Sequence, residues 1–228
     1  QARKDFIAAI TARAALLGIT ADRVVPATVS GGVAIIDGVE WPDKVATQRD
    51  ALLARIARHG TGGFAQTMEE VAYTWFNRFA ALRYMELHDY LGHGHRALSS
   101  SAASPGALPD LLTHAADIAQ TASLPGLNTA QVLELKLAGN RDGELYRLLL
   151  VAQCNALSAA MPFLFERIDD DTELLLPDHL LRTDSIIAKL VAGVPEEDWQ
   201  EIEVIGWLYQ FYISEKKDQV IGKVVKSE

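Results

Sequence analysis

The sequence has a single cysteine, Cys154, so it cannot form an internal disulfide. Its 16 glycines and 8 prolines are too few for a collagen-like or low-complexity protein. No apolar run reaches the roughly 20 residues that span a membrane, and no signal-peptide core is present at the N-terminus. These absences favour a protein without membrane contact in a reducing compartment such as the cytoplasm.

Positive charge is also scarce, and its distribution is uneven. Residues 1–114 carry 11 Lys and Arg against 11 Asp and Glu, whereas residues 115–228 carry 10 against 19. The whole net charge of −9 therefore lies in the second half. A dominant nucleic-acid-binding domain usually has a basic face, which this chain taken alone does not indicate. The hydrophobic content of 49% is typical of a folded globular chain.

The periodicity of apolar residues predicts a mainly α fold, a bundle-like helical domain with one short β-hairpin near the N-terminus. The hairpin would pair residues 24–29 with 33–36 across Ser30-Gly31-Gly32. Asp110 and Asn128 are expected to be helix N-caps, as is Thr183 or Asp184. Residues 165–182 fit irregular structure or short helices. Helices are expected over 3–17, 42–58 (with Pro42 in its first turn), 65–91, 110–120, 128–138 and 142–160, then up to Gly193, and in one long helix after Pro195.

A stretch rich in Ser, Gly and Pro marks an internal boundary at residues 92–109. We therefore expect a helical subdomain with the hairpin over 1–91, a linker or loop over 92–109, and an acidic helical subdomain over 110–228. One continuous domain is the alternative. The chain begins at Gln1 rather than Met, and its end carries no helix stop signal, so we expect a trimmed chain or a fragment.

Motifs of catalysis and cofactor binding are absent from the sequence. There is no phosphate-binding loop ending in Gly-Lys-Ser/Thr, no Gly-x-Gly-x-x-Gly and no Gly-x-Ser-x-Gly. The run Gly60-Thr61-Gly62-Gly63 lacks the lysine and is interpreted as a turn between helices. Cys154 lies among apolar residues of an expected helix and is interpreted as a buried structural thiol. We predict no catalytic and no cofactor-binding residue.

A histidine cluster, His88, His93 and His95, is the one group that suggests a metal. It lies in a loop-like segment without a second pair of ligands. The acidic run Asp169-Asp170-Asp171 lacks the other parts of a calcium loop. We therefore predict no metal site, and a metal-dependent enzyme that uses these groups remains a weaker alternative.

The aromatic stripe Tyr73-Thr74-Trp75-Phe76 within residues 65–91 could stack on bases, but its helical period predicts a core face. Asn77, Arg78 and Arg83 would then emerge from the flank of this helix. The candidates for nucleic-acid contact are these residues and basic groups of the first 60 residues. The predicted contacts are Arg49, Arg55, Asn77, Arg78 and Arg83, and Arg3, Lys4 and Arg58 are further basic groups on residues 1–60.

Two blocks of sequence are more specific than composition. They are Glu69-Glu-Val-Ala-Tyr-Thr-Trp-Phe-Asn-Arg-Phe-Ala-Ala-Leu-Arg-Tyr-Met-Glu86 and Ile205-Gly-Trp-Leu-Tyr-Gln-Phe-Tyr-Ile-Ser-Glu-Lys-Lys-Asp218. With the opening Gln-Ala-Arg-Lys-Asp-Phe, they resemble the N-terminal region of the PglX family. These are adenine-specific DNA methyltransferases of BREX phage-defence systems, and they are similar to fused restriction–modification methyltransferases. The resemblance spans the chain and is loose over 92–200.

The resemblance implies a non-catalytic helical segment of a larger enzyme of the bacterial cytoplasm. In that family a Gly-rich S-adenosyl-L-methionine motif and an Asn-Pro-Pro-Tyr motif follow this region, and this chain has neither. The implied partners are double-stranded DNA through the parent protein, the rest of the methyltransferase chain and other defence subunits. The implied role is DNA engagement or partner docking. If the parent holds DNA in a channel, the uneven charge predicts that the acidic half, residues 115–228, faces away from the phosphates.

A free-standing all-α protein-interaction module is the alternative, and it would dock proteins through the acidic half. The two hypotheses differ in what the gene encodes downstream of Glu228. They also differ in the effect of charge: if the first holds, we expect reversal of Arg78 and Arg83 to weaken DNA binding by the parent more than changes over 196–203.

Overall fold

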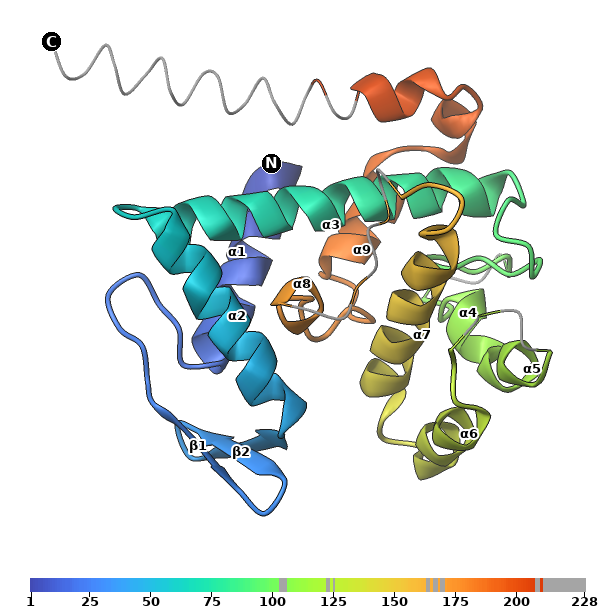
Figure 1. Ribbon diagram of the computed structural model, residues 1–228. Helices are drawn as coiled ribbons and strands as arrows, with labels where there is room; N and C mark the ends of the chain where they lie inside the picture. The colour runs from blue at the N-terminus through green and yellow to red at the C-terminus, as the bar shows by residue number, and fades with distance from the viewer. Residues whose placement is uncertain are drawn as a thin grey trace, which may run out of the picture.

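The fold is known from a computed structural model that describes residues 1–102, 106–121, 124, 126–162, 165, 168, 171–207 and 210. Helices predominate among these residues, and a small antiparallel sheet lies near the N-terminus (Figure 1). The predicted mainly α class is therefore confirmed. No helix among the described residues is both long and apolar enough to cross a membrane.

Three long helices of the first half agree with the predicted ranges to within a few residues. They are α1 (Ala2–Leu16), α2 (Lys44–Arg58) and the 25-residue α3 (Gly63–Leu87). α3 runs along one side of the molecule, with α1 and α2 packed against it (Figure 1). Its buried face repeats at three and four residues, which confirms the core interpretation of the aromatic stripe. That face includes Met68, Val71, Trp75, Phe79 and Leu82.

The predicted hairpin is present but is part of a three-stranded sheet. β1 (Ala27–Ser30) and β2 (Val33–Ile36) are joined by Gly31 and Gly32, whose φ values are both positive. A third strand, β3 (Val39–Pro42), pairs with β2 and was not predicted. Pro42 therefore ends an edge strand, where its missing N–H is tolerated, and its predicted place in the first turn of a helix is wrong.

The expected helix over 110–120 is divided at His114 into α4 (Asp110–Thr113) and α5 (Ala115–Gln120). Asp110 is not its N-cap, because its carboxylate accepts hydrogen bonds from Ser100 and Ser101 instead. α6 (Thr129–Ala138) and α7 (Asp142–Leu157) follow. Asn128 caps α6 as predicted, accepting a 3.1 Å hydrogen bond from the N–H of Gln131.

The last part of the described chain is less regular than predicted. α8 (Asp171–Leu174) is one turn long, and α9 (Ile186–Gly193) is capped by Ser185 rather than by Thr183 or Asp184. The long helix expected after Pro195 is interrupted: a 3₁₀ turn, η1 (Glu196–Trp199), precedes a helical segment at 203–207. The rest of that prediction lies mostly outside the described residues.

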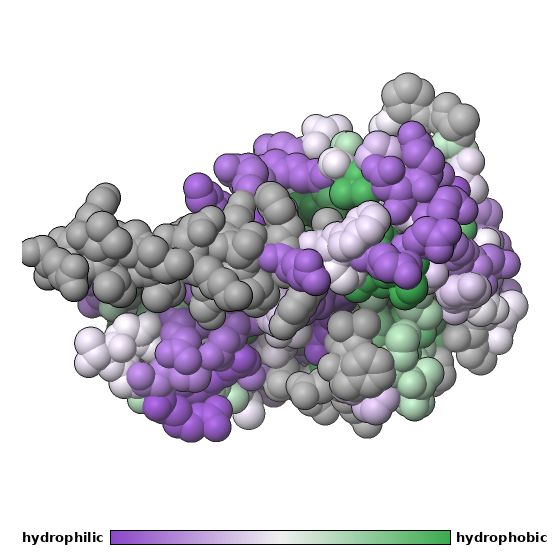
Figure 2. All heavy atoms as spheres, turned by 90° about the horizontal axis from the view of Figure 1, so that it is seen from above, coloured by the Kyte–Doolittle hydropathy of each residue, from purple (hydrophilic) through white to green (hydrophobic). Residues whose placement is uncertain are grey.

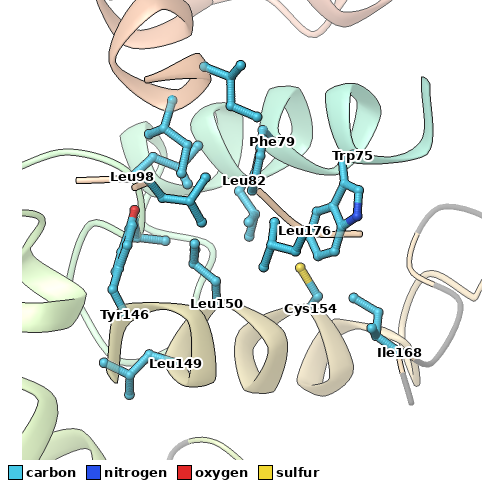
Figure 3. Packing of buried hydrophobic residues seen from close by; sticks show 14 of the residues in the cluster. Trp75, Phe79, Leu82, Leu98, Tyr146, Leu149, Leu150, Cys154, Ile168 and Leu176 are labelled. Atoms are coloured by element: carbon cyan, nitrogen blue, oxygen red, sulfur yellow. The ribbon is translucent and has the colours of Figure 1, made fainter. Parts of the chain in front are cut away.

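One part of the hydrophobic core lies between α3 and α7. Trp75, Phe79 and Leu82 of α3 point toward Leu150 and Cys154 of α7, and Leu176 lies between them (Figure 3). The same buried cluster includes residues from before and after the segment 92–109. The division of the chain into subdomains stays a prediction.

Candidate functional site

Arg49, a predicted nucleic-acid contact, lies inside the protein on α2. Its Nε donates a 2.9 Å hydrogen bond to the carbonyl of Leu17, and its Nη2 donates to the carbonyl of Val25. Burial lowers the pKa of this guanidinium. The arginine thus joins α2 to the segment that follows α1.

Arg55, another predicted contact, takes part in a network around α8. Its guanidinium lies 3.1 Å from Asp171 and 3.3 Å from Glu70 of α3. Its side chain is 24% exposed, so the network leaves part of it accessible. Arg55 therefore connects α2, α3 and α8.

Arg83 belongs to a buried ionic network on α3, although the sequence predicted that it would emerge from the helix flank. Its Nη1 lies 2.6 Å from Glu86, and its Nη2 lies 2.9 Å from Glu196. Burial raises the pKa of Glu86, while the N–H of Leu98 and the charge of Arg83 act in the opposite direction. The network holds the segment after α3 and η1 against α3.

Arg78 is buried as well, so the predicted orientation of both arginines is wrong. Its guanidinium lies over the ring of Trp75, 5.2 Å from the ring centroid, and its charge acts against the rise in the pKa of Cys154 that burial causes. Asn77, on the neighbouring helical position, is half-buried. The five predicted contacts thus do not form one accessible surface, and DNA contact by any of them stays a prediction.

Exposed basic groups of the first half lie elsewhere. Lys4, Arg23 and Arg58 are exposed and take part in no ion pair within the described part of the chain. Arg23 lies at the edge of a cavity of about 380 Å³ beside the turn between α2 and α3. Sequence reasoning missed Arg23, although it lies between a predicted helix and the hairpin, where a basic side chain is readily accessible.

The glycine-rich turn Gly60–Gly63 borders this cavity, and it is a turn between helices, as predicted. A Cβ atom at Gly63 would lie 2.1 Å from the carbonyl oxygen of Ile56, so only glycine lets α2 and α3 approach this closely. The cavity is otherwise lined largely by apolar side chains. These are Ile19, Val24, Leu53, Ile56 and Phe64.

Of the predicted histidine cluster, His93 and His95 lie together, with ring centroids 5.8 Å apart, while His88 has a different partner. His88 forms a 2.8 Å hydrogen bond with the carbonyl of Trp199, while His93 forms one of 2.7 Å with Gln153. His95 stacks on His114, which the sequence did not suggest, with ring centroids 4.3 Å apart. Among the described residues no group of three His, Cys, Asp or Glu side chains is placed to hold a metal ion.

Cys154 is fully buried on α7, as its apolar neighbours predicted. Its sulfur points into the core between α3 and α7 (Figure 3). Burial raises the pKa of the thiol to about 12, so the reactive thiolate is suppressed at neutral pH. The thiol therefore fills space rather than reacting.

The sequence is similar to parts of two larger proteins. No family model matches it. The adenine-specific methyltransferase BrxX of Escherichia coli O9:H4 (strain HS) is 51% identical over 233 residues, which cover 100% of this chain and 19% of that protein. The adenine-specific methyltransferase PglX of Lacticaseibacillus casei (strain Zhang) is 32% identical over 241 residues, covering 98% and 20%. The chain spans about a fifth of the length of these relatives. The resemblance to the PglX family is thereby confirmed: from end to end, the chain matches an N-terminal segment of adenine-specific methyltransferases.

Proposed function

We propose that this chain is the helical, non-catalytic N-terminal part of a site-specific DNA adenine N6-methyltransferase of a BREX or restriction–modification defence system. The observation that carries the proposal is the 51% identity over the whole chain to a protein named as an adenine-specific methyltransferase. S-adenosyl-L-methionine is then the methyl donor of the parent protein, which acts in the bacterial cytoplasm. The chain's own residues supply structure and binding surfaces.

The charge distribution supports a role in DNA engagement for the first half. Lys4, Arg23 and Arg58 are exposed, whereas most arginines of this half are engaged inside the fold. A phosphate backbone would be attracted to these groups and repelled by the acidic second half. In the parent enzyme, the first half thus faces DNA and the second half faces protein. Other defence subunits are candidate partners for that acidic side.

The gene tests the identity of the parent directly. We expect it to encode a Gly-rich S-adenosyl-L-methionine loop and an Asn-Pro-Pro-Tyr motif downstream of Glu228. The purified full-length protein should form N6-methyladenine in DNA with this donor. A reading frame without these motifs, or a protein that transfers no methyl group, overturns the proposal.

DNA engagement is tested by charge reversal in the full-length protein. The double variant Arg23→Glu/Arg58→Glu should weaken DNA binding. It should also make the plot of log binding constant against log salt concentration less steep, by roughly 0.9 for each of about two lost phosphate contacts. The matched variant Asp142→Lys/Glu144→Lys, on α7, should not weaken it. Equal losses in both variants at the same salt concentration would refute the assignment of the DNA-facing side.

A further inference from the structure

The segment after α9 is firmly attached to the C-terminal end of α3. Trp199 is fully buried, and its backbone carbonyl accepts a 2.8 Å hydrogen bond from His88, the residue that follows α3. Glu196 forms ion pairs with Arg83 and Arg96 at 2.9 and 2.8 Å. Val204 is only 5% exposed. Residues 196–204 are therefore held against the C-terminal end of α3, and together with the adjoining residues 205–207 they are called the platform below.

The outward side of this platform exposes large apolar side chains. Trp207 is 65% exposed and Ile202 is 56% exposed, although both follow residues that are anchored in the core. Within the helical segment 203–207, Val204 faces inward. Glu203 and Trp207, four residues apart, share the opposite, exposed side. Gly206 is exposed next to Trp207 and leaves room for a partner backbone to approach.

The rim of this surface is acidic. Glu197, Asp198, Glu201 and Glu203 are all exposed, and none takes part in an ion pair within the described ranges. On the face of the molecule that Figure 2 shows, hydrophilic residues are widespread and hydrophobic ones form smaller areas. Such a rim repels nucleic acid and complements a basic protein surface. A tryptophan framed by polar groups is the residue type that most often anchors protein interfaces.

We propose that Ile202 and Trp207, with these four carboxylates, form the surface on which the rest of the methyltransferase chain docks. This inference rests on the function proposed above. The chain spans about a fifth of the length of its relatives, so the proposed parent has a much larger part that needs a surface to pack on. An apolar centre with an acidic rim is suited to a partner of complementary charge. The contacting surface of the parent is apolar at its centre and rich in Lys and Arg at its edge.

A photo-cross-linking amino acid at position 207 of the full-length protein tests the proposal. We expect intramolecular cross-links to residues beyond 228, identified by mass spectrometry. The same probe at position 137 is the control, because Leu137 on α6 is 85% exposed and should give no such products. Cross-links from position 207 confined to residues 1–228, to a second copy, to another protein or to DNA, or no cross-links at all, overturn the proposal.

A second variant measures the strength of the contact. Trp207→Ala in the full-length protein should speed protease cleavage between the two parts by roughly tenfold or more, the scale expected when an interface anchor is lost. Leu137→Ala should leave the rate unchanged, and equal rates in the two variants contradict the proposal.

Methylation is assayed on the same preparations. An active enzyme without cross-links refutes the docking surface alone, and an inactive protein with cross-links refutes the proposed function alone.

Discussion

At the scale of single residues, the arginines of this protein act chiefly as internal connectors. A guanidinium carries five N–H donors in a fixed plane and can be buried only where carbonyl or carboxylate oxygens accept them. Arg49 donates to two carbonyls, and the two Nη atoms of Arg83 donate to Glu86, Ser99 and Glu196, while its Nε finds no acceptor among the described residues. The charge of Arg83 is therefore paired with carboxylates, whereas that of Arg49 is held by backbone carbonyls, and neither guanidinium is exposed to a ligand.

Removal of Arg83 should destabilise the protein strongly. Arg83→Met would leave Glu86, whose side chain is 0% exposed, without its cation. The loss of one partner of a buried pair typically costs about 3–5 kcal/mol. The midpoint of urea unfolding measures this loss.

Arg58→Met is the matched control for this prediction, because Arg58 is exposed and unpaired among the described residues; its effect should stay within about 0.5 kcal/mol. Equal midpoints for the two variants would show that the network contributes little. The same reasoning changes the interpretation of charge reversal at Arg78 and Arg83, because weaker DNA binding by those variants would follow from unfolding alone.

The buried position of these arginines could not be predicted from the sequence. A charged side chain is exposed by default, and the partner Glu196 lies 113 residues away from Arg83 along the chain. The burial of Cys154 and Trp75 could be predicted, because their apolar neighbours recur at helical spacing. Local sequence patterns thus identify the apolar residues of the core. Which charged side chains are buried with them depends on partners that are distant in the sequence.

His95 should make the protein less stable in mild acid. Burial, together with His114 and His93, lowers the pKa of His95 below its ordinary value of 6.5, while Asp110 and Asp117 act in the opposite direction. The unfolded chain then binds a proton that the folded chain does not, so this contribution to stability is present above pH 6.5 and is lost as the pH falls below it.

Unfolding midpoints at pH 7.5 and pH 5.5 test this prediction (about one unit to either side of the ordinary histidine pKa). The variant His95→Gln should lose less stability between the two values than the parent sequence does. An identical drop in both proteins would show that other groups account for the acid sensitivity.

At the scale of elements, the ends of helices and strands show which boundaries a local sequence signal can predict. Asn128 was predicted as a cap because its side chain can accept a first-turn N–H, and it does. The strand β3 was missed although Asp37-Gly38, both with positive φ, separates it from β2. Asp-Gly between two apolar runs is a strong hairpin signal, so the sequence contained the information that predicts the third strand.

Loss of the cap on α6 gives a measurable effect of moderate size. Asn128→Ala should lower the free energy of unfolding by about 1 kcal/mol, because the N–H of Gln131 loses its acceptor. Asn140→Ala, at an exposed bend after the same helix, is the control and should change it by less than about 0.5 kcal/mol. Equal losses of unfolding free energy in the two variants would show that the hydrogen bond from Gln131 to Asn128 contributes little to stability.

At the scale of the whole molecule, the short segment 171–178 joins elements from distant parts of the chain. Trp75 of α3 donates a 3.0 Å hydrogen bond to the carbonyl of Thr172, and Arg13 of α1 pairs with Asp178 at 2.5 Å. Arg147 of α7 donates to the carbonyls of Glu173, Leu174 and Leu176. The sequence left this region ambiguous because its order comes from these contacts rather than from periodicity.

Arg147 is therefore expected to be critical for stability. Burial, together with the charge of Arg13, lowers its pKa to about 10, which still leaves it charged at neutral pH. Arg147→Met should remove more than about 3 kcal/mol, because several buried carbonyls lose their donors at roughly 1–3 kcal/mol each.

Arg147→Lys should restore only a small part of the stability lost in Arg147→Met, since an ammonium cannot reach carbonyls in the planar arrangement of a guanidinium. Thermal melting of the three proteins makes the comparison. Full recovery by lysine would show that charge alone matters at this position.

The contacts of the segment 171–178 also determine when the core can be completed during synthesis of the chain. Trp75 and its acceptor at Thr172 are separated by 97 residues, and Arg13 and Asp178 by 165. At roughly 5–20 residues per second, Trp75 is synthesised about 5–20 s before that acceptor. During this interval the apolar face of α3 lacks part of its cover, so the nascent chain passes through a stage at which a chaperone can bind it, and a ribosome stalled before residue 171 would hold a product unable to complete its core.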